Sequence, residues 1–129
     1  MTKDEWAKVE TATKSFFSMA KLKIDDYDIA LRLQRVSIYK NVIMVYVNDV
    51  FKGEWLANDC EERRRFMCKK ERNLATKSKI KHLPKKEQKI LIEKYKYCVY
   101  SPYWTSFSSL KKHLIKENQS IELVEILIV

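Results

Sequence analysis

Glycine is almost absent from this chain of 129 residues, in which Gly53 is the single example. Average usage of about 7% would give about nine glycines in a chain of this length. Loops that cradle phosphate groups need several glycines in one turn, because the backbone must approach the ligand closely. The scarcity of glycine therefore excludes both a Walker-type phosphate loop and a glycine-rich dinucleotide-binding motif.

Long apolar runs are missing as well. The longest is Val42–Val47, whereas a helix that spans a bilayer needs about 20 apolar residues. The stretch Met1–Trp6 has no apolar segment behind a basic one, so the sequence predicts no signal peptide. We therefore expect a cytoplasmic protein with no membrane partner.

Cysteine and histidine are too few and too widely spaced for a zinc site. No C-x-x-C or H-x-x-x-H pair occurs among the three cysteines and two histidines, which are Cys60, Cys68, Cys98, His82 and His113. The odd number of cysteines indicates reduced thiols. A nucleophile–base pair of Cys98 and His113 is not favoured either, because the apolar neighbours of Cys98 predict an inert buried thiol.

Acidic residues cluster at one place, Asp25, Asp26 and Asp28. Such carboxylates can hold Mg²⁺ for phosphoryl chemistry, but aspartate is also a routine turn-forming residue. A restriction-type nuclease needs an acidic-x-Lys pair on the next strand, which Gly53–Trp55 does not supply. We therefore expect no enzymatic activity and no cofactor, and a metal-dependent nuclease is the least favoured alternative.

What is present is the composition of a folded domain, with 46% hydrophobic and 12% aromatic residues. The length suits a single domain, residues 1–129, with two very small domains as the remote alternative. Helical and alternating apolar patterns predict an α+β fold. Its centre is an antiparallel three-stranded meander, which later strands can extend, packed against an N-terminal helix and C-terminal helices.

The predicted elements follow from local signals. Thr2 and Glu5 form a capping-box pair, so a helix is predicted from Thr2 to about Ala20. The meander spans Tyr27–Leu56, with Gly53 marking a bulge or close backbone packing in its last strand. The expected strands of the meander are Ile29–Leu33, Val42–Val47 and Val50–Leu56. Helices are expected at 58–72, 84–94 and 105–118, with a basic connector at 73–82 and a short strand at 97–100. The tail, 121–129, is predicted as a strand, with a bulged strand or a helix left open because Glu122 and Glu125 break the alternation.

Positive charge is concentrated in one stretch of the chain, whose formal net charge is +9. The segment Arg63–Lys89 contains twelve Lys and Arg residues against two Glu, so it carries +10 and the remainder −1. Clustered like charges repel, so the stretch is either a solvated face or the contact surface for an anionic partner. Phosphate backbones are the obvious partner.

Aromatic residues could add to such a surface, because single-strand binders stack bases on exposed rings beside basic grooves. Most of the aromatics are expected in the core. Tyr103 and Trp104 follow Pro102 in a predicted loop and are expected to be exposed. The predicted binding residues are therefore Arg63, Arg64, Arg65, Lys69, Lys70, Arg72, Lys77, Lys79, Lys81, Lys85, Lys86, Tyr103 and Trp104.

Two segments of this lysine-rich, glycine-poor chain stand out, Tyr46–Leu56 (YVNDVFKGEWL) and Tyr100–Glu125 (YSPYWTSFSSLKKHLIKENQSIELVE). Both resemble segments of small accessory proteins of phages and prophages of AT-rich Gram-positive bacteria. The resemblance implies a protein of the bacterial host cell that acts by binding. Its targets would be DNA, host polymerase or replication machinery, or an antiviral nucleoprotein such as a CRISPR effector. The resemblance supplies no site residues.

We therefore expect a non-enzymatic phage-type binding protein. Its basic segment would engage nucleic acid or the nucleic-acid-facing surface of a host nucleoprotein, and inhibition of a CRISPR nuclease is the sharpest version of this hypothesis. The alternative is a DNA- or RNA-binding regulator, which would bind naked nucleic acid with a steep salt dependence. The apolar tail 126–129 can also pair across a two-fold axis, so a homodimer is left open.

Overall fold

The computed structural model describes residues 1–128, which divide into two compact units. The first, which we call the sheet unit, is formed by Met1–Cys68 together with the chain from Ser101 onward. The second, the basic unit, is Lys69–Tyr100. The expectation of a single domain stays a prediction, because a division into compact units does not test it.

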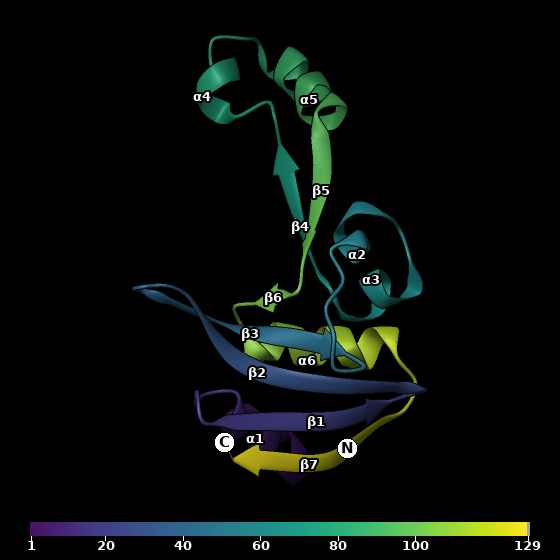
Figure 1. The fold of residues 1–129 in the computed structure, drawn as a ribbon. Coiled ribbons are helices and arrows are strands. Elements are labelled where there is room, and N and C mark those ends of the chain that lie inside the picture. Colours follow the sequence, from purple (N-terminus) through teal and green to yellow (C-terminus); the bar gives the residue numbers. More distant parts are fainter. Residues whose placement is uncertain (129) are drawn as a thin grey trace. The chain divides into compact units, whose positions relative to one another are not determined.

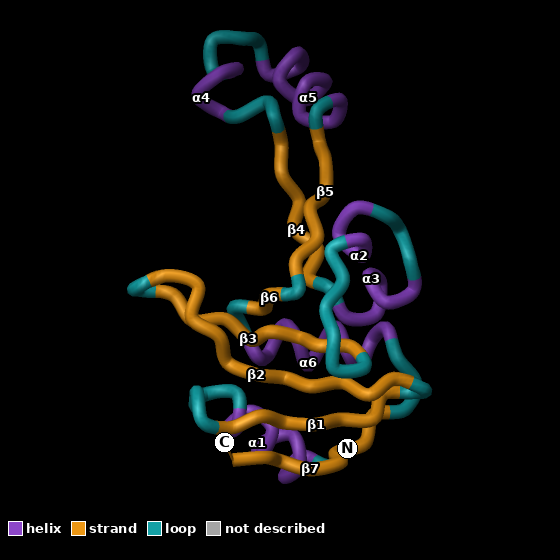
Figure 2. The backbone as a smooth tube through the Cα atoms, viewed as in Figure 1, coloured by secondary structure: helices purple, strands orange, loops and turns teal. Residues whose placement is uncertain are grey.

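The sheet unit is built on five antiparallel strands in the order β6-β3-β2-β1-β7 (Figures 1 and 2). Its elements in chain order are α1 (Lys3–Ala12), β1 (Ser18–Ile24), β2 (Tyr27–Ser37), β3 (Lys40–Val47), α2 (Glu54–Ala57), α3 (Glu61–Phe66), β6 (Tyr103–Trp104), α6 (Phe107–Glu117) and β7 (Ile121–Ile128). The α+β class and the three-stranded antiparallel meander are confirmed, and the meander consists of β1, β2 and β3.

The N-terminal helix is shorter than predicted. The capping box is present, since Thr2 Oγ1 accepts a hydrogen bond from the Glu5 N–H and the Glu5 carboxylate accepts one from the Thr2 N–H. The helix ends at Ala12, and the residues assigned to its last turn begin β1. Every second side chain of β1, from Ala20 to Ile24, is buried, because its register places these residues beside the apolar side of β2.

The third strand predicted at Val50–Leu56 is wrong. This segment holds a single bridge, Val47↔Val50, and then the short helix α2. The helical turn places the Trp55 ring in the core. A strand would instead direct successive side chains of this segment to opposite faces of the sheet. Close packing at Gly53 is also wrong, because a Cβ added there would meet no heavy atom within 4 Å.

The helix predicted over 58–72 is likewise shorter and is followed by a strand. Helix α3 ends at Phe66, and Met67 has extended backbone angles. Both side chains are fully buried, so the chain leaves the helix where two consecutive apolar residues enter the core.

The tail is a strand, as predicted. Its register against β1 shifts between Lys21 and Leu22. This irregularity places Glu125 opposite Lys21 and Glu122 opposite Lys23, so both carboxylates lie across from a lysine. Of the two alternatives left open for the tail, the bulged strand therefore explains the broken alternation. Residue 129 lies outside the described residues.

The core of the sheet unit lies between the sheet and the helices α1 and α6, which lie behind the strands in Figure 1. Burying these apolar side chains is the main stabilising contribution. The largest fully buried side chains are Phe66, Leu22, Ile24, Ile29, Leu31, Met67, Leu110, Leu114, Val9, Val45 and Val47.

The basic unit pairs two strands and carries two helices between them. Its elements are β4 (Cys68–Asn73), α4 (Lys77–Ile80), α5 (Lys85–Lys94) and β5 (Lys96–Ser101). The predicted helix at 84–94 and strand at 97–100 are confirmed, and α4 lies within the predicted connector. Asn73, at the end of β4, links this strand to α5, because its side-chain amide donates a hydrogen bond to the Ile92 carbonyl at 2.7 Å. The same side chain accepts a hydrogen bond from the Ala75 N–H at 2.8 Å. Within residues 69–100, all of which are described, Ile80 is the one buried side chain.

None of the helices found in residues 1–128 is both long and apolar enough to cross a membrane.

Candidate nucleic-acid interface

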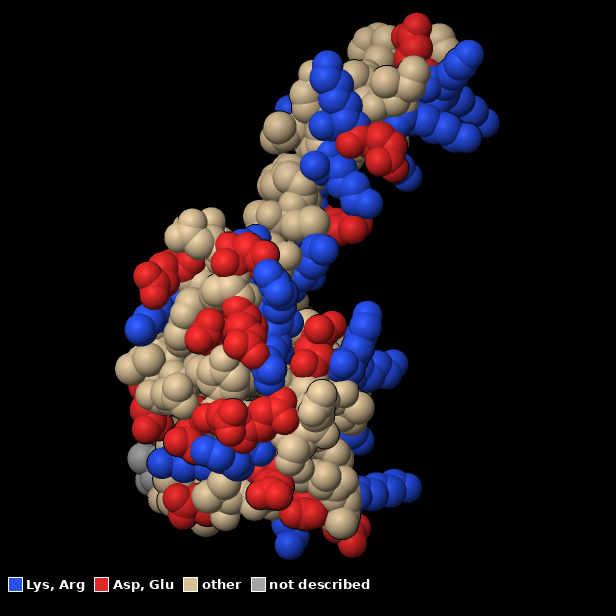
Figure 3. Space-filling model, turned by 90° about the vertical axis from the view of Figure 1, so that its right-hand side faces the viewer, with Lys and Arg blue, Asp and Glu red and all other residues tan. Residues whose placement is uncertain are grey.

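Almost the whole net charge of the protein belongs to the basic unit. Residues 69–100 contain eleven Lys and Arg residues against three Glu, which gives +8 of the total +9. The sheet unit therefore carries about one net positive charge. In Figure 3, more blue (Lys and Arg) than red (Asp and Glu) is visible over the part drawn at the top, which is the basic unit.

Eight of the predicted binding residues lie in this unit and are distributed over all its parts. All but Lys70, which is half-buried, have exposed side chains. They are Lys69, Lys70 and Arg72 on β4, Lys77 and Lys79 on α4, Lys81 after it, and Lys85 and Lys86 on α5.

Few of these cations have an anionic partner within the protein. Across residues 69–100, the one ion pair joins Lys96 Nζ to Glu71 Oε1 at 3.4 Å. Lys94 Nζ lies 5.5 Å from the centre of the Tyr95 ring. No other ion pair is found within these residues, so the remaining cations are available to an external anion.

The positions of three lysines are unfavourable for the helices that carry them. Lys85 and Lys86 occupy the first turn of α5, and Lys77 begins α4. The helix dipole favours negative charge at an N-terminus, and each misplaced charge costs about 0.3–1 kcal/mol at low ionic strength. These cations therefore do not stabilise their own helices, whereas a bound anion would relieve the repulsion.

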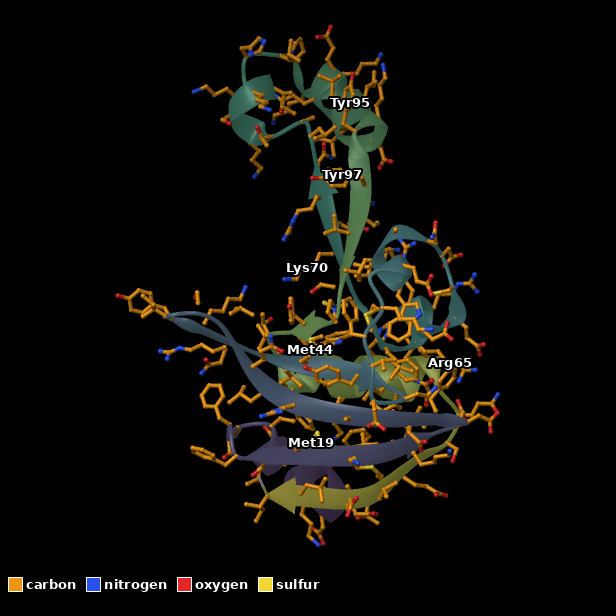
Figure 4. All side chains as sticks on the ribbon, viewed as in Figure 1. Met19, Met44, Arg65, Lys70, Tyr95 and Tyr97 are labelled. Atoms are coloured by element: carbon orange, nitrogen blue, oxygen red, sulfur yellow. The ribbon has the colours of Figure 1, made fainter. Side chains whose placement is uncertain are left out.

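Exposed aromatic side chains accompany the cations. Tyr95 follows the last residue of α5 and Tyr97 belongs to β5, and both side chains are exposed. Figure 4 labels both, together with Lys70 further along the strand pair. Neither was among the predicted binding residues. The signal that could have found them is their spacing, since each is next to a lysine, Lys94 or Lys96.

Three of the four arginines of the predicted cluster, Arg63, Arg64 and Arg65, have a different environment, because they belong to α3 of the sheet unit. Arg64 makes two hydrogen bonds to the Asp59 carboxylate, at 3.0 and 2.7 Å. This contact with Arg64 holds the pKa of the Asp59 carboxyl below its usual value. Arg63 is half-buried.

Arg65 is the centre of an internal network. Its guanidinium contacts Asp25 and Glu61 at 2.6 Å each and the Asn118 side chain at 3.2 Å. It also lies 5.5 Å from the centre of the Tyr27 ring. These contacts join α3 to the β1–β2 turn and to the end of α6, so the charge of Arg65 serves the fold.

Asp25 is the acceptor of this network. Its carboxylate accepts hydrogen bonds from the backbone N–H groups of Ser120 and Gln119 and from Arg65. The Ser120 N–H contributes most to lowering the pKa of Asp25, and burial opposes it in part. Asp25 has a positive φ of 50°, which aspartate tolerates in a tight turn.

The two predicted aromatic contact residues lie on β6 rather than in a loop. Trp104 is 5% exposed, and its Nε1–H donates to the Phe66 carbonyl at 3.0 Å. The expectation that Trp104 is exposed is wrong, because pairing of β6 with β3 directs this side chain into the core. Tyr103 is half-buried and lies opposite Met44 in the same pairing.

The acidic, thiol and imidazole groups form no metal centre in the described part of the chain, where no three His, Cys, Asp or Glu side chains are grouped for one. Of the acidic cluster, Asp25 binds Arg65 and Asp28 pairs with Lys23 at 3.4 Å. Cys98 is exposed in the basic unit, contrary to the buried thiol predicted. His113 Nε2 contacts the Arg64 carbonyl at 2.9 Å in the sheet unit.

Comparison of the chain with protein-family models, with curated proteins and with solved structures found no match.

Proposed function

We propose that this protein binds nucleic acid through the basic unit and carries out no chemistry on it. The single observation that supports the proposal is the surplus of exposed, unpaired cations in residues 69–100. Phosphate groups neutralise such a surface and release counterions, which makes binding favourable and salt-dependent. Tyr95 and Tyr97 add ring faces on which unpaired bases can stack, so single strands are the expected ligand.

The test is a titration of a labelled single strand of about 20 nucleotides, followed by fluorescence anisotropy from about 50 to 200 mM salt. One variant replaces five exposed lysines of the basic unit by glutamine: Lys77, Lys79, Lys81, Lys85 and Lys86. The matched control replaces five exposed lysines of the sheet unit in the same way: Lys3, Lys8, Lys52, Lys112 and Lys116. Both variants lose the same charge, so they separate a local site from a general effect of net charge.

The expected result is a loss of affinity and a shallower salt dependence in the first variant alone. Each phosphate contact on a single strand contributes about 0.7 to the slope of log K against log salt, so losing five contacts lowers it by about 3.5. Equal losses in the two variants would leave only a non-specific charge effect. No binding by the unaltered protein would refute the proposal.

A second candidate function is favoured by apolar side chains that the basic unit exposes. Contacts with phosphate groups do not require such side chains. They include Leu74, Ile90, Ile92 and Val99. They support the narrower hypothesis of a phage-type inhibitor that occupies the nucleic-acid-binding surface of a host nucleoprotein, such as a CRISPR nuclease. This hypothesis expects weak binding to naked nucleic acid and capture of a protein complex that survives nuclease treatment of the lysate.

A further inference from the structure

The tip of the β2–β3 hairpin, residues 35–41, is a second exposed and basic element, separate from the basic unit. We call it the hairpin tip. Strand β1 pairs with β2 from Ile24↔Tyr27 to Met19↔Arg32, and β6 pairs with β3 as far as Ile43↔Trp104. The hairpin beyond Leu33↔Ile43 therefore continues as a two-stranded ribbon. All seven residues of the tip are exposed. Figure 1 shows the ribbon running past the neighbouring strands of the sheet unit.

The turn at the end of this ribbon has unusual residues. Ile38 and Tyr39 form the two-residue loop between the paired Ser37 and Lys40. Such loops favour Asn, Asp and Gly, because one or both residues usually take a positive φ. The β1–β2 turn follows this rule with Asp25 and Asp26 and the positive φ of Asp25, whereas neither Ile38 nor Tyr39 has a positive φ. The geometry of the turn therefore does not explain its two large apolar side chains.

Burial does not explain them either. Tyr39 is 97% exposed and Ile38 is 75% exposed, and Val36 is exposed beside them. Three large apolar side chains within four residues gain nothing from the fold while they face water. They are therefore available to a partner.

The charges around these side chains indicate the chemistry of that partner. Arg35 Nη2 donates to the Ile38 carbonyl at 3.0 Å, which holds the guanidinium beside the turn. Lys40 follows Tyr39 directly, and residues 33–41 contain no Asp or Glu. Neither cation has an ion pair among residues 1–128. An exposed ring between two unpaired cations matches a ligand that offers both flat π-faces and negative charge, and an unpaired nucleotide offers both.

We infer that the hairpin tip is a nucleobase-stacking element. The ring of Tyr39 stacks on an unpaired base of single-stranded nucleic acid, and Arg35 and Lys40 contact the adjoining phosphates. Ile38 packs against the edge of the stacked base. This inference rests on the proposed function, because it concerns the same class of ligand, but it depends on residues of the sheet unit.

The experiment measures the affinity of three full-length variants for the labelled single strand at one salt concentration, and then the salt dependence of each. Tyr39→Ala removes the ring, Tyr39→Phe keeps it, and Phe17→Ala removes a ring that is 69% exposed elsewhere in the sheet unit. Stacking on one base accounts for about 5- to 150-fold in affinity by alanine substitution. We expect this loss for Tyr39→Ala, with an unchanged salt slope, because the ring carries no charge. Tyr39→Phe and Phe17→Ala are expected to bind like the unaltered protein.

The outcomes separate this inference from the proposed function. If the five-lysine variant loses binding while Tyr39→Ala binds normally, the basic unit is the site and the stacking role of the hairpin tip is refuted. If Tyr39→Phe is as weak as Tyr39→Ala, the phenol hydroxyl acts and stacking is refuted. If the unaltered protein binds no nucleic acid, both proposals fail. A duplex of the same sequence should show a smaller effect of Tyr39→Ala, because its bases are already stacked, and an equal effect would count against an unpaired base.

Discussion

Replacement of Trp104 by phenylalanine tests whether this residue serves the core or a partner. The indole N–H is the donor to the Phe66 carbonyl, and Phe66 is the last residue of α3. Removing the donor leaves a buried carbonyl without its hydrogen bond, which costs about 1–3 kcal/mol. The smaller ring also leaves space in a packed region, and a partial truncation of this kind costs about 1–2 kcal/mol on the scale of core substitutions. We therefore expect Trp104→Phe to lower the free energy of unfolding by about 2–5 kcal/mol.

The matched control is Trp55→Phe. Trp55 is 7% exposed, and its indole N–H makes no hydrogen bond to another group in residues 1–128. This variant loses ring volume but no hydrogen bond, so we expect a loss of about 1–2 kcal/mol. The difference between the two variants isolates the bond to the Phe66 carbonyl.

Urea unfolding followed by far-UV circular dichroism measures both losses, since tryptophan fluorescence is itself altered by the substitutions. Nucleic-acid affinity is measured on the folded variants. A loss of affinity in Trp104→Phe with unchanged stability would show that Trp104 contacts a partner after all. A smaller loss of stability in Trp104→Phe than in Trp55→Phe would refute the role given to the hydrogen bond.

Two further predictions concern the sheet unit. The pKa of Asp25 is lowered from its ordinary value of 3.8 by the Ser120 N–H and its other partners, so its ionised form stabilises the fold above that pH. This contribution is lost as the pH falls through about 3.8 and below. Asp25→Asn should therefore be less stable than the unaltered protein at neutral pH, but it should lose less stability in acid. Thermal unfolding from about pH 6 to pH 2.5 measures both effects. If the stability of Asp25→Asn fell with pH as steeply as that of the unaltered protein, the role given to Asp25 would be contradicted. Thr2→Ala removes the side-chain cap of α1 and should cost about 0.5–2 kcal/mol in urea unfolding. The Thr76 side chain precedes α4 but makes no capping hydrogen bond to that helix, and its hydroxyl contacts Ser78 Oγ at 3.2 Å instead. An equal loss from Thr76→Ala would count against the capping argument.

Elements with strong local signals could be predicted from the sequence. The capping pair Thr2 and Glu5 marks the start of α1, the apolar run Val42–Val47 becomes the core of β3, and Pro84 precedes α5. Ser106, near the start of the helix predicted at 105–118, caps α6 by accepting a hydrogen bond from the Ser109 N–H. Each signal acts within a few residues of the chain, so tertiary contacts are not needed to read it.

The errors arose where pairing between distant residues decides the structure. Phe16 and Ala20 have helical spacing with Trp6 and Val9, but Ala20, Leu22 and Ile24 also alternate as a strand does. Pairing of β1 with both β2 and β7 favours the strand, and neither partner is visible in a local pattern. The same holds for Trp104, which is placed in the core by a two-residue strand paired to β3.

The concentration of positive charge could be read from the sequence, but the local environment of each cation could not, for a related reason. Arg65 lies in the same basic run as Lys69, but its partner Asp25 is 40 positions away in the sequence. A count of neighbouring charges therefore assigned to a binding surface an arginine that holds two segments of the sheet unit together. The exposed tyrosines Tyr95 and Tyr97 were missed because aromatic residues are more often buried.

The charge of the basic unit does not depend on such pairing. Residues 69–100 contain eleven cations and three carboxylates, so a net charge of +8 remains uncompensated within that unit whatever the rotamers of its side chains. The acidic residues that pair with Arg64 and Arg65 belong to the sheet unit, so they are not part of this count. With little apolar core to stabilise it and a surplus that repels itself, the basic unit gains most from a polyanion. Binding should therefore raise the protection of its backbone amides from hydrogen exchange more than it does for the strands of the sheet unit.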